Sequence, residues 1–524
     1  MKRRLVATLL LAVLTDASLA AAQPAVPPGA VPPPGAAPAP AAPAVSGSFT
    51  LREAPTGGLV SGKDALRVEP GGLTAAAVAE RAVAESPDAK VAEARVRAAA
   101  AKVDKTVVMF LPRLSVGAKY MRTSPSEINF GGGAMVGALN EGPILVADCP
   151  VPGMEGQQCA VDSAGIPLGA TPFDIPTFNN HYSLSASLAV PISDYVLRLS
   201  NALDATKVYE SSTRIGLRAA RLATAANAKV AYYNWLRAVA AVAVAESSLT
   251  RTQALLNDTK TAFTLGAATR ADVMRLEALV AGTEQMITES RGFRSLAAEQ
   301  LATLMAEPSQ EYRVGEDVLG APAPALTGPS EALVAEAMRQ RLEVQALDAA
   351  MRAIDRGVKA ARVSQYPRLD AFGQFDYARP NPTYFPSTDE WKHNWALGLS
   401  LSYNLNDPLD SRASIAEFAA QKAEMESNRL ALERGVRLEV TSTLIGAQNA
   451  RSAVETARRG AEAAGEAYRV SRELYRAGRA TTTDLINAEG ELVAASLREV
   501  NALLDVKVAD VKLEHALGRD VPQK

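Results

Sequence analysis

An internal duplication restricts the fold of this chain more than any other feature of its sequence. Three segments of the first half recur, in the same order, in the second half. With their copies they are 111–114 and 366–369, 182–194 and 395–407, and 263–277 and 475–489. The distance between copies shortens after the first pair, which indicates an insertion at 124–179. We therefore expect a fold built from two similar units.

The duplication also predicts how the chain is divided. The expected segments are a signal peptide at 1–22, a Pro/Ala-rich linker at 23–70, repeat 1 at 71–307, a connector at 308–328, repeat 2 at 329–518 and a tail at 519–524. Each repeat is expected to contain a helix, two strands separated by a loop, a long helix, a tight turn and another helix. The signal peptide follows from a basic start, a short apolar run and small residues before the cleavage point. It predicts that the mature chain works outside the cytoplasm.

Two very long helices are expected, one in each repeat. Residues 194–265 and 409–477 contain no proline, and about 70 helical residues extend roughly 100 Å. Partner helices are expected at 271–305 and 483–517, where apolar residues recur at helical spacing. An extended coiled coil that serves as a spacer would also contain such helices. It would not explain why strand patterns lie at one end of each helical pair.

Four segments of about ten residues alternate between apolar and small polar side chains, as strands do. They are 114–121, 182–192, 369–377 and 395–405. About ten residues is the length of a tilted strand that crosses a bilayer, but a half-buried sheet of a soluble protein has the same alternation. The signal peptide and the long helices favour the membrane. No apolar run reaches the roughly 18 residues of a membrane helix, so membrane entry is expected through strands.

Four strands cannot close around a channel, and lipid does not tolerate open sheet edges. The chain is therefore expected to form oligomers. Two copies would supply eight strands, whose interior side chains fill, whereas three copies would supply twelve and leave an opening.

The chain resembles the TolC-type outer-membrane efflux proteins over nearly all of residues 72–518. The resemblance rests on the duplicated order, on Pro112 and Pro367 at the entries to the strands, and on a repeated turn motif. The motif residues are Phe263, Gly266, Asp272 and Val273 in the first copy, and Tyr475, Gly478, Asp484 and Leu485 in the second. One copy of so short a motif would be weak evidence, but two copies at matched positions are strong evidence.

The resemblance implies a mainly α protein with a transmembrane β-barrel. It implies a homotrimer with a 12-stranded barrel in the outer membrane of a Gram-negative-type cell, continued by a long α-helical tunnel in the periplasm. The implied function is passive export as the exit duct of a tripartite system. The implied partners are a periplasmic adaptor, an inner-membrane transporter and outer-membrane lipid. The alternative is a periplasmic coiled-coil adaptor or spacer without a barrel.

By resemblance, the two helix-to-helix turns form a tip at which the adaptor docks. The residues assigned to this tip are Gly266, Ala268, Thr269, Gly478, Thr481 and Thr482. The glycines can adopt the left-handed conformation that ends a helix, and threonine hydroxyls can cap the next one. A plain hairpin turn would need the same residues, and only the duplicated sequence that follows favours docking.

The resemblance also places a gate at this tip. Asp272 corresponds to a gate carboxylate and would meet Arg479 and Tyr475 of the second hairpin. Asp484 would project a threefold ring of carboxylates into the pore, where it would attract cations. Asn487 stands where some family members have a second aspartate, so the inner ring should be weaker here. Asp484 could equally be a helix N-terminal residue stabilised by the helix dipole.

The insertion contains both cysteines of the chain, Cys149 and Cys159. In an oxidising compartment a disulfide between them is the default expectation. Two cysteines are too few ligands for a metal site. Placed between two membrane strands, the insertion should lie on the outside of the cell.

The composition argues against other classes of protein. The net charge of −2 gives no general attraction to nucleic acid. His181, His393 and His515 stand in no catalytic or metal-binding motif, and there is no phosphate-binding glycine loop. We therefore expect no enzyme activity, no cofactor, no metal and no nucleic-acid partner, and we expect another protein to supply the energy for export.

Overall fold

The computed structural model describes residues 62–124, 134–138, 140–172, 177–320 and 328–520. The predicted signal peptide and most of the predicted linker lie outside these residues, and so do the last four residues of the predicted tail.

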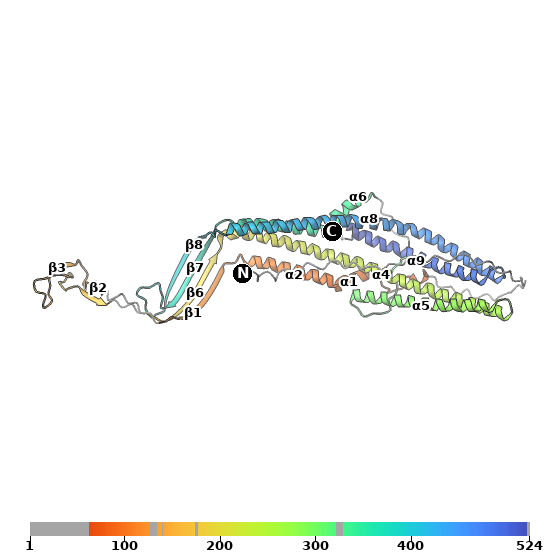
Figure 1. Ribbon diagram of the computed structural model, residues 1–524, viewed down its shortest axis with the longest axis horizontal. Coiled ribbons are helices and arrows are strands. Elements are labelled where there is room, and N and C mark those ends of the chain that lie inside the picture. The colour runs from red at the N-terminus through yellow and green to blue at the C-terminus, as the bar shows by residue number, and fades with distance from the viewer. Residues whose placement is uncertain (1–61, 125–133, 139, 173–176, 321–327, 521–524) are drawn as a thin grey trace, which may run out of the picture. The chain divides into compact units, whose positions relative to one another are not determined.

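The main elements form two runs with the same order of helices and strands (Figure 1). The first run comprises α1 (Ala75–Glu85), α2 (Pro87–Val108), β1 (Arg113–Arg122), β6 (Asn180–Val190), α4 (Ser200–Thr264) and α5 (Arg270–Met305). The second run comprises α6 (Ser330–Gln340), α7 (Leu342–Val363), β7 (Arg368–Arg379), β8 (Lys392–Ser402), α8 (Asp407–Arg476) and α9 (Thr482–Leu517). The duplicated order of elements that the sequence predicts is therefore confirmed.

Shorter elements lie between the main ones. They are η1 (Asp64–Leu66), β2 (Ala134–Gly137), β3 (Leu145–Asp148), β4 (Gln158–Val161), β5 (Gly169–Pro172), α3 (Ile192–Asp194) and the π-helical turn η2 (Tyr195–Leu199). The insertion was expected to be a loop, but it contains two small antiparallel sheets, β2 with β5 and β3 with β4. Strands of four residues are too short to leave a visible period in the sequence.

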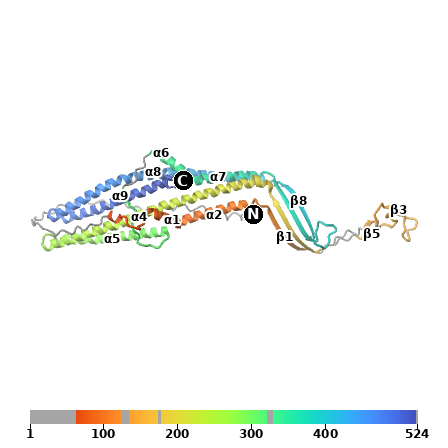
Figure 2. The same cartoon turned by 180° about the vertical axis from the view of Figure 1, so that it is seen from behind.

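The long helices form two hairpins that pack against each other. α4 has 65 residues and α8 has 70, which corresponds to about 100 Å each. α4 packs along α5, α8 packs along α9, and α4 also contacts α9, so the hairpins touch each other (Figures 1 and 2). Among the described residues, no helix is both long enough and apolar enough to cross a membrane.

The four long strands form one antiparallel sheet in the order β1-β6-β7-β8. The central pair, β6 with β7, joins the two repeats and places Leu188 opposite Gly373. Within the described residues β1 and β8 each have one partner, so both outer edges of this sheet are unpaired. β8 lies a few residues earlier than predicted, because Asn404 and Asp407 form a turn that leads into α8.

One face of this sheet is apolar and uncovered in the protomer. On β8, Trp395, Leu397, Leu399 and Leu401 are between 68% and 75% exposed. Residues directly opposite each other share a face, and the register places Leu399 opposite Ala371. The predicted alternation is therefore present, but its apolar side is not buried by the chain's own helices, as it would be in a soluble sheet.

The main core lies where the first hairpin meets α1 and the connector. Tyr232 of α4 is fully buried and donates a hydrogen bond to the carbonyl oxygen of Leu73 at 2.7 Å. The neighbouring Tyr233 donates to the Glu316 carboxylate at 2.9 Å. Glu316 also accepts a hydrogen bond from the backbone amide of Ala75, which begins α1. The connector therefore ties the N-terminal helix to the long helix.

The connector and the segment before α1 approach each other at two glycines. Leu73 and Val314 form a parallel bridge. A Cβ atom at Gly72 would lie 2.4 Å from the carbonyl carbon and oxygen of Val314, and a Cβ at Gly315 would lie 2.2 Å from the carbonyl oxygen of Gly72. Only glycine fits at these two positions without moving the backbone.

We predict that Gly72→Ala lowers the thermal unfolding midpoint of the detergent-solubilised protein. The added methyl group would overlap the backbone of Val314, and such overpacking costs about 1–3 kcal/mol. The matched control is Gly490→Ala in α9, where a Cβ meets nothing within 4 Å and helix propensity should improve by about 0.5–1 kcal/mol. Circular dichroism would measure both midpoints. Equal midpoints for the two variants would contradict the close approach.

Candidate functional site

The turns at the ends of the two hairpins have the same backbone structure. Gly266 has φ +76° and Gly478 has φ +70°, the left-handed conformation that ends a helix. The amide of Ala267 donates to the carbonyl oxygen of Ala262 at 2.8 Å, and the amide of Arg479 donates to that of Leu474 at 2.8 Å. These bonds close each helix in the same way. The left-handed conformation predicted for both glycines is therefore confirmed.

Each of the following helices begins with a reciprocal cap between a threonine and an aspartate. The Asp272 amide donates to Thr269 Oγ1 at 3.2 Å, and the Thr269 amide donates to Asp272 Oδ2 at 3.1 Å. Thr481 and Asp484 repeat this arrangement at 3.2 and 2.9 Å. The duplicated Thr-x-x-Asp sequence is thus a capping box. It fixes both aspartates at helix starts, as one of the two interpretations of Asp484 expected.

Asp272 also links the two hairpins, but through a partner that the sequence did not suggest. The Thr482 side chain of α9 lies close enough to its carboxylate to lower its pKa, and Arg275 Nη1 of its own helix lies 3.2 Å from the carboxylate. Burial tends to raise the pKa of Asp272, but the hydrogen bonds from Thr269 and Thr482 and the charge of Arg275 leave it below its ordinary value. The carboxylate is therefore ionised at neutral pH, and its contribution to stability is lost only when the pH falls through this lowered pKa.

The expected pair between Arg479 and Asp272 is not formed within the protomer, and a pair between neighbouring copies stays a prediction. No hydrogen bond or ion pair joins these two residues in the part of the protomer that the structure describes. Arg479 lies exposed in the turn between α8 and α9. Asp272 instead pairs with Arg275, which lies three residues further along its own helix α5. An i, i+3 pair within a helix needs no particular packing of the hairpins, which explains why it forms here.

The hydrogen bond of Tyr475 within the protomer goes to another residue than Asp272. Its hydroxyl lies 2.9 Å from Thr259 Oγ1 of α4, and either oxygen can be the donor. Its ring packs against a small apolar cluster formed by Leu255, Leu276 and Leu485. Tyr475 therefore connects the two hairpins one level above the turns.

Sequence reasoning missed three residues of this contact region. Thr259 bonds Tyr475, while Asp258 of α4 lies 3.8 Å from Arg476 of α8. Thr259 follows the buried Leu255 by four residues, so helical periodicity could have placed it on the inner face of α4. Nothing comparable marks Asp258 and Arg476, because their meeting depends on how the hairpins pack.

The residues assigned to adaptor docking differ in exposure. Four of the six are exposed, namely Gly266, Thr269, Gly478 and Thr481, and Ala268 is half-buried. Thr482 is only 4% exposed in the protomer, so it offers little surface to a partner, and the docking role of the six residues stays a prediction. Asp484 and Asn487 are exposed in the protomer. The hydrogen bond from the Thr481 side chain lowers the pKa of Asp484, so it is ionised at neutral pH, but a pore-facing ring remains a prediction.

The two cysteines of the insertion lie close together, both as free thiols. β3 and β4 pair antiparallel, and the Cys149 amide donates to the carbonyl oxygen of Gln157 at 2.9 Å. A hydrogen bond with Cys149 raises the pKa of the Cys159 thiol to about 11. The two thiols are thus adjacent, and a disulfide between them in an oxidising compartment stays a prediction.

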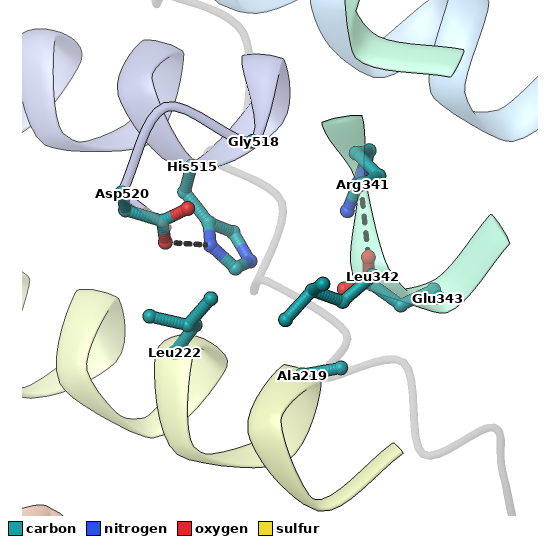
Figure 3. A pocket seen from close by; sticks show the side chains of 8 residues that line it. All are labelled: Ala219, Leu222, Arg341, Leu342, Glu343, His515, Gly518 and Asp520. Carbon is teal, nitrogen blue, oxygen red and sulfur yellow. Dashed lines mark hydrogen bonds and ion pairs between the residues drawn. The ribbon is translucent and has the colours of Figure 1, made fainter. Parts of the chain in front are cut away.

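A further polar cluster lies where the end of α9 meets the junction of α6 and α7 (Figure 3). His515 Nδ1 is 2.7 Å from Asp520 Oδ2, and Arg341 at the junction bonds Glu343 and Glu439. The hydrogen bond with Asp520 raises the pKa of His515 above 6.5. Protonated His515 therefore adds stability at low pH that is lost as the pH rises through the raised pKa. This cluster fastens the C-terminal end of α9 and is far along the chain from the turns.

The comparisons with known proteins identify the class. The chain matches the family model of outer membrane efflux proteins over residues 78–307 and 333–519. It therefore belongs to the outer membrane efflux protein family. It is an outer-membrane exit duct with helices in the periplasm, and the alternative of an adaptor or spacer is rejected. Channels of this family form trimers and work with an adaptor and an inner-membrane transporter. Its relatives are channels and not enzymes.

Several solved structures share the fold. The VceC outer membrane protein of Vibrio cholerae is 18% identical, with a TM-score of 0.63 over 84% of this chain and 95% of VceC. The CmeC channel of Campylobacter jejuni is 14% identical, with a TM-score of 0.64 over 90% of this chain and 94% of CmeC. The open state of the MtrE channel of Neisseria gonorrhoeae is 17% identical, with a TM-score of 0.64 over 85% and 88% of the two chains. No curated protein sequence matches the chain.

We predict that Thr482→Val raises the frequency of channel openings in planar lipid bilayers. The substitution keeps the shape of the side chain but removes the hydroxyl that interacts with the Asp272 carboxylate, and a hydrogen bond between them in the closed duct is worth about 1 kcal/mol per protomer. That corresponds to about a fivefold change in an equilibrium constant. The control is Thr483→Val, one residue further along the same turn and exposed. Identical opening frequencies in the two variants would show that this bond does not hold the turns together.

Proposed function

We propose that three copies of this chain close their sheets into one 12-stranded barrel, and that the hairpin turns form the closed, adaptor-binding end of the duct. The observation that carries the proposal is the four-stranded sheet, whose two outer edges are unpaired and whose apolar face is exposed. Open edges and unpaired backbone groups are not tolerated in lipid. Pairing β8 of one copy with β1 of the next removes every edge.

Twelve strands also suit the function. A barrel of eight strands is filled by its own side chains, whereas twelve strands leave an opening. The serines on the second face of β6, such as Ser183, Ser185 and Ser187, would then line a polar interior, while Leu399 and its neighbours meet lipid.

The turns suit the opposite end of the duct. The exposed glycines present no side chain, and a Cβ at Gly266 or Gly478 would meet nothing within 4 Å. This leaves room for a partner's helical hairpin to approach the backbone. The proposed partners are a periplasmic adaptor and the inner-membrane transporter that supplies energy.

In this proposal the gate is held by contacts between the hairpins rather than by Arg479. Within the protomer these are Asp272 with Thr482 and Thr259 with Tyr475. Asp484, exposed next to its cap, remains the candidate for a ring of carboxylates in the assembled trimer. The adaptor would open the duct by offering alternative contacts to the turns.

We predict that Leu399→Arg impairs assembly of the barrel, whereas Ser400→Arg has a milder effect. Leu399 is 68% exposed on the apolar face and Ser400 points to the other face. A lipid-facing charge at the middle of the membrane costs about 2–4 kcal/mol. Cross-linking in outer membranes measures assembly, and the unmodified protein should give a trimer. A strict monomer or dimer would contradict the proposed architecture, and equal assembly of the two variants would contradict the assigned faces.

We predict that Gly478→Glu abolishes export while the trimer still forms. The charged side chain would occupy the space that the proposed partner needs. Gly478 has a positive φ, which would also strain any residue with a Cβ. The control is therefore Gly478→Asn, because asparagine tolerates this conformation. Accumulation of an exported dye in intact cells measures export. Normal export by Gly478→Glu would argue against docking at the turns.

A further inference from the structure

A buried polar cluster joins the two hairpins between the core and the turns. Glu489 of α9 is 2% exposed, and its carboxylate accepts hydrogen bonds from Ser248 Oγ at 2.9 Å and Arg251 Nε at 3.0 Å, both on α4. Arg251 Nη2 lies 2.8 Å from the same carboxylate, and Nη1 donates to Ser247 Oγ at 2.8 Å. Both charged groups are therefore paired and hydrogen-bonded across the interface of the hairpins.

This cluster differs in burial from the other ion pairs between the hairpins. The side chains of Arg251 and Glu489 are 13% and 3% exposed. Those of Arg237 and Asp505 are 37% and 52% exposed, and those of Arg476 and Asp258 are 28% and 31% exposed. Separating a buried pair leaves uncompensated charges out of water, whereas separating an exposed pair costs little.

The three pairs occupy different levels along the hairpins. Arg237 and Asp505 lie on the core side of the cluster, since they precede Arg251 on α4 and follow Glu489 on α9. Asp258 lies on the turn side, about 10 Å along α4 from Arg251. On the turn side the remaining polar contacts are single hydrogen bonds, such as Thr259 with Tyr475.

We propose that Ser247, Ser248, Arg251 and Glu489 form a clasp that stays closed when the duct opens, so that the hairpin ends separate about this level. The proposal rests on the gate at the turns proposed above. Among the polar contacts between the hairpins, the clasp costs most to break, and those between it and the turns cost least. Opening therefore separates the turn side and leaves the core side in place. Arg251 and Glu489 are positioning residues in this scheme, because neither is assigned to the pore.

Cross-linking on either side of the clasp tests the pivot directly. One variant carries Arg237→Cys with Asp505→Cys, on the core side, and the other carries Asp258→Cys with Arg476→Cys, on the turn side. Both replace a partly exposed Arg–Asp pair, so the same reducible bismaleimide linker serves both. Cys149 and Cys159 are replaced by serine in each variant to remove background reaction. Adaptor-dependent export is measured before and after the linker is reduced.

The expected result is normal export with the core-side link and loss of export with the turn-side link, which reduction restores. A block by both links would overturn the pivot, because it would mean that the hairpins also separate at the core side. Normal export with both links would overturn the gate at the turns itself, and the pivot with it. The two failures are therefore distinguishable, and the clasp is unaltered in both variants.

A second measurement tests the clasp residues themselves. Glu489→Gln removes the charge that compensates Arg251 and should raise the frequency of adaptor-free openings about 5- to 30-fold. The matched control, Asp505→Asn, removes the exposed acidic partner of Arg237 on the same two helices and should leave the frequency within about twofold of the unmodified channel. Trimer yield is compared in parallel, because a merely structural role would lower yield without raising openings. Equal opening frequencies in the two variants would overturn the proposal.

Discussion

The unpaired edges of the four-stranded sheet are the constraint on which the rest of the structure depends. The protomer exposes large apolar side chains of this sheet, from Leu114 on β1 to Leu401 on β8. It also has no partner of its own for the backbone groups at the outer edges of β1 and β8. The proposed pairing with further copies would meet both requirements at once, since it would place the apolar face in lipid and the edges in hydrogen bonds. The pairing of β6 with β7 joins the two repeats and makes the contribution of each chain a single continuous sheet.

Much of this fold could be predicted from the sequence because the signals are local. The lengths of α4 and α8 follow from the absence of proline, and the strand faces follow from strict alternation. The left-handed turns follow from Gly266 and Gly478. Each of these depends on the backbone and a few neighbouring residues, so tertiary packing does not change it. The insertion was predicted less well, because its four-residue strands have no detectable period.

The candidate site was predicted less completely because it depends on contacts between hairpins. The sequence singles out the duplicated aspartates Asp272 and Asp484, and both begin helices in the structure. Their Thr-x-x-Asp spacing was itself a capping-box signal, which explains their duplication without any pore. The residue that contacts Asp272 from the other hairpin could not be predicted from sequence spacing. Thr482 meets it only because α5 and α9 converge at the turns, and neither sequence spacing nor charge pattern contains that information.

Comparing the two copies of the duplication distinguishes the residues that cap the helices from the residues that contact the other hairpin. The capping residues are the same in both hairpins. Most of the residues that join one hairpin to the other differ, although Glu489 has an identical counterpart in Glu277. With the register that aligns Phe263 with Tyr475, the counterpart of Arg251 is Ala463, and only the second copy has the hydroxyl that bonds Thr259. Only the first hairpin therefore supplies the arginine of the clasp, and only the second supplies the tyrosine hydroxyl. These differences make the contact between the hairpins asymmetric, while the duplicated capping residues keep the turns alike.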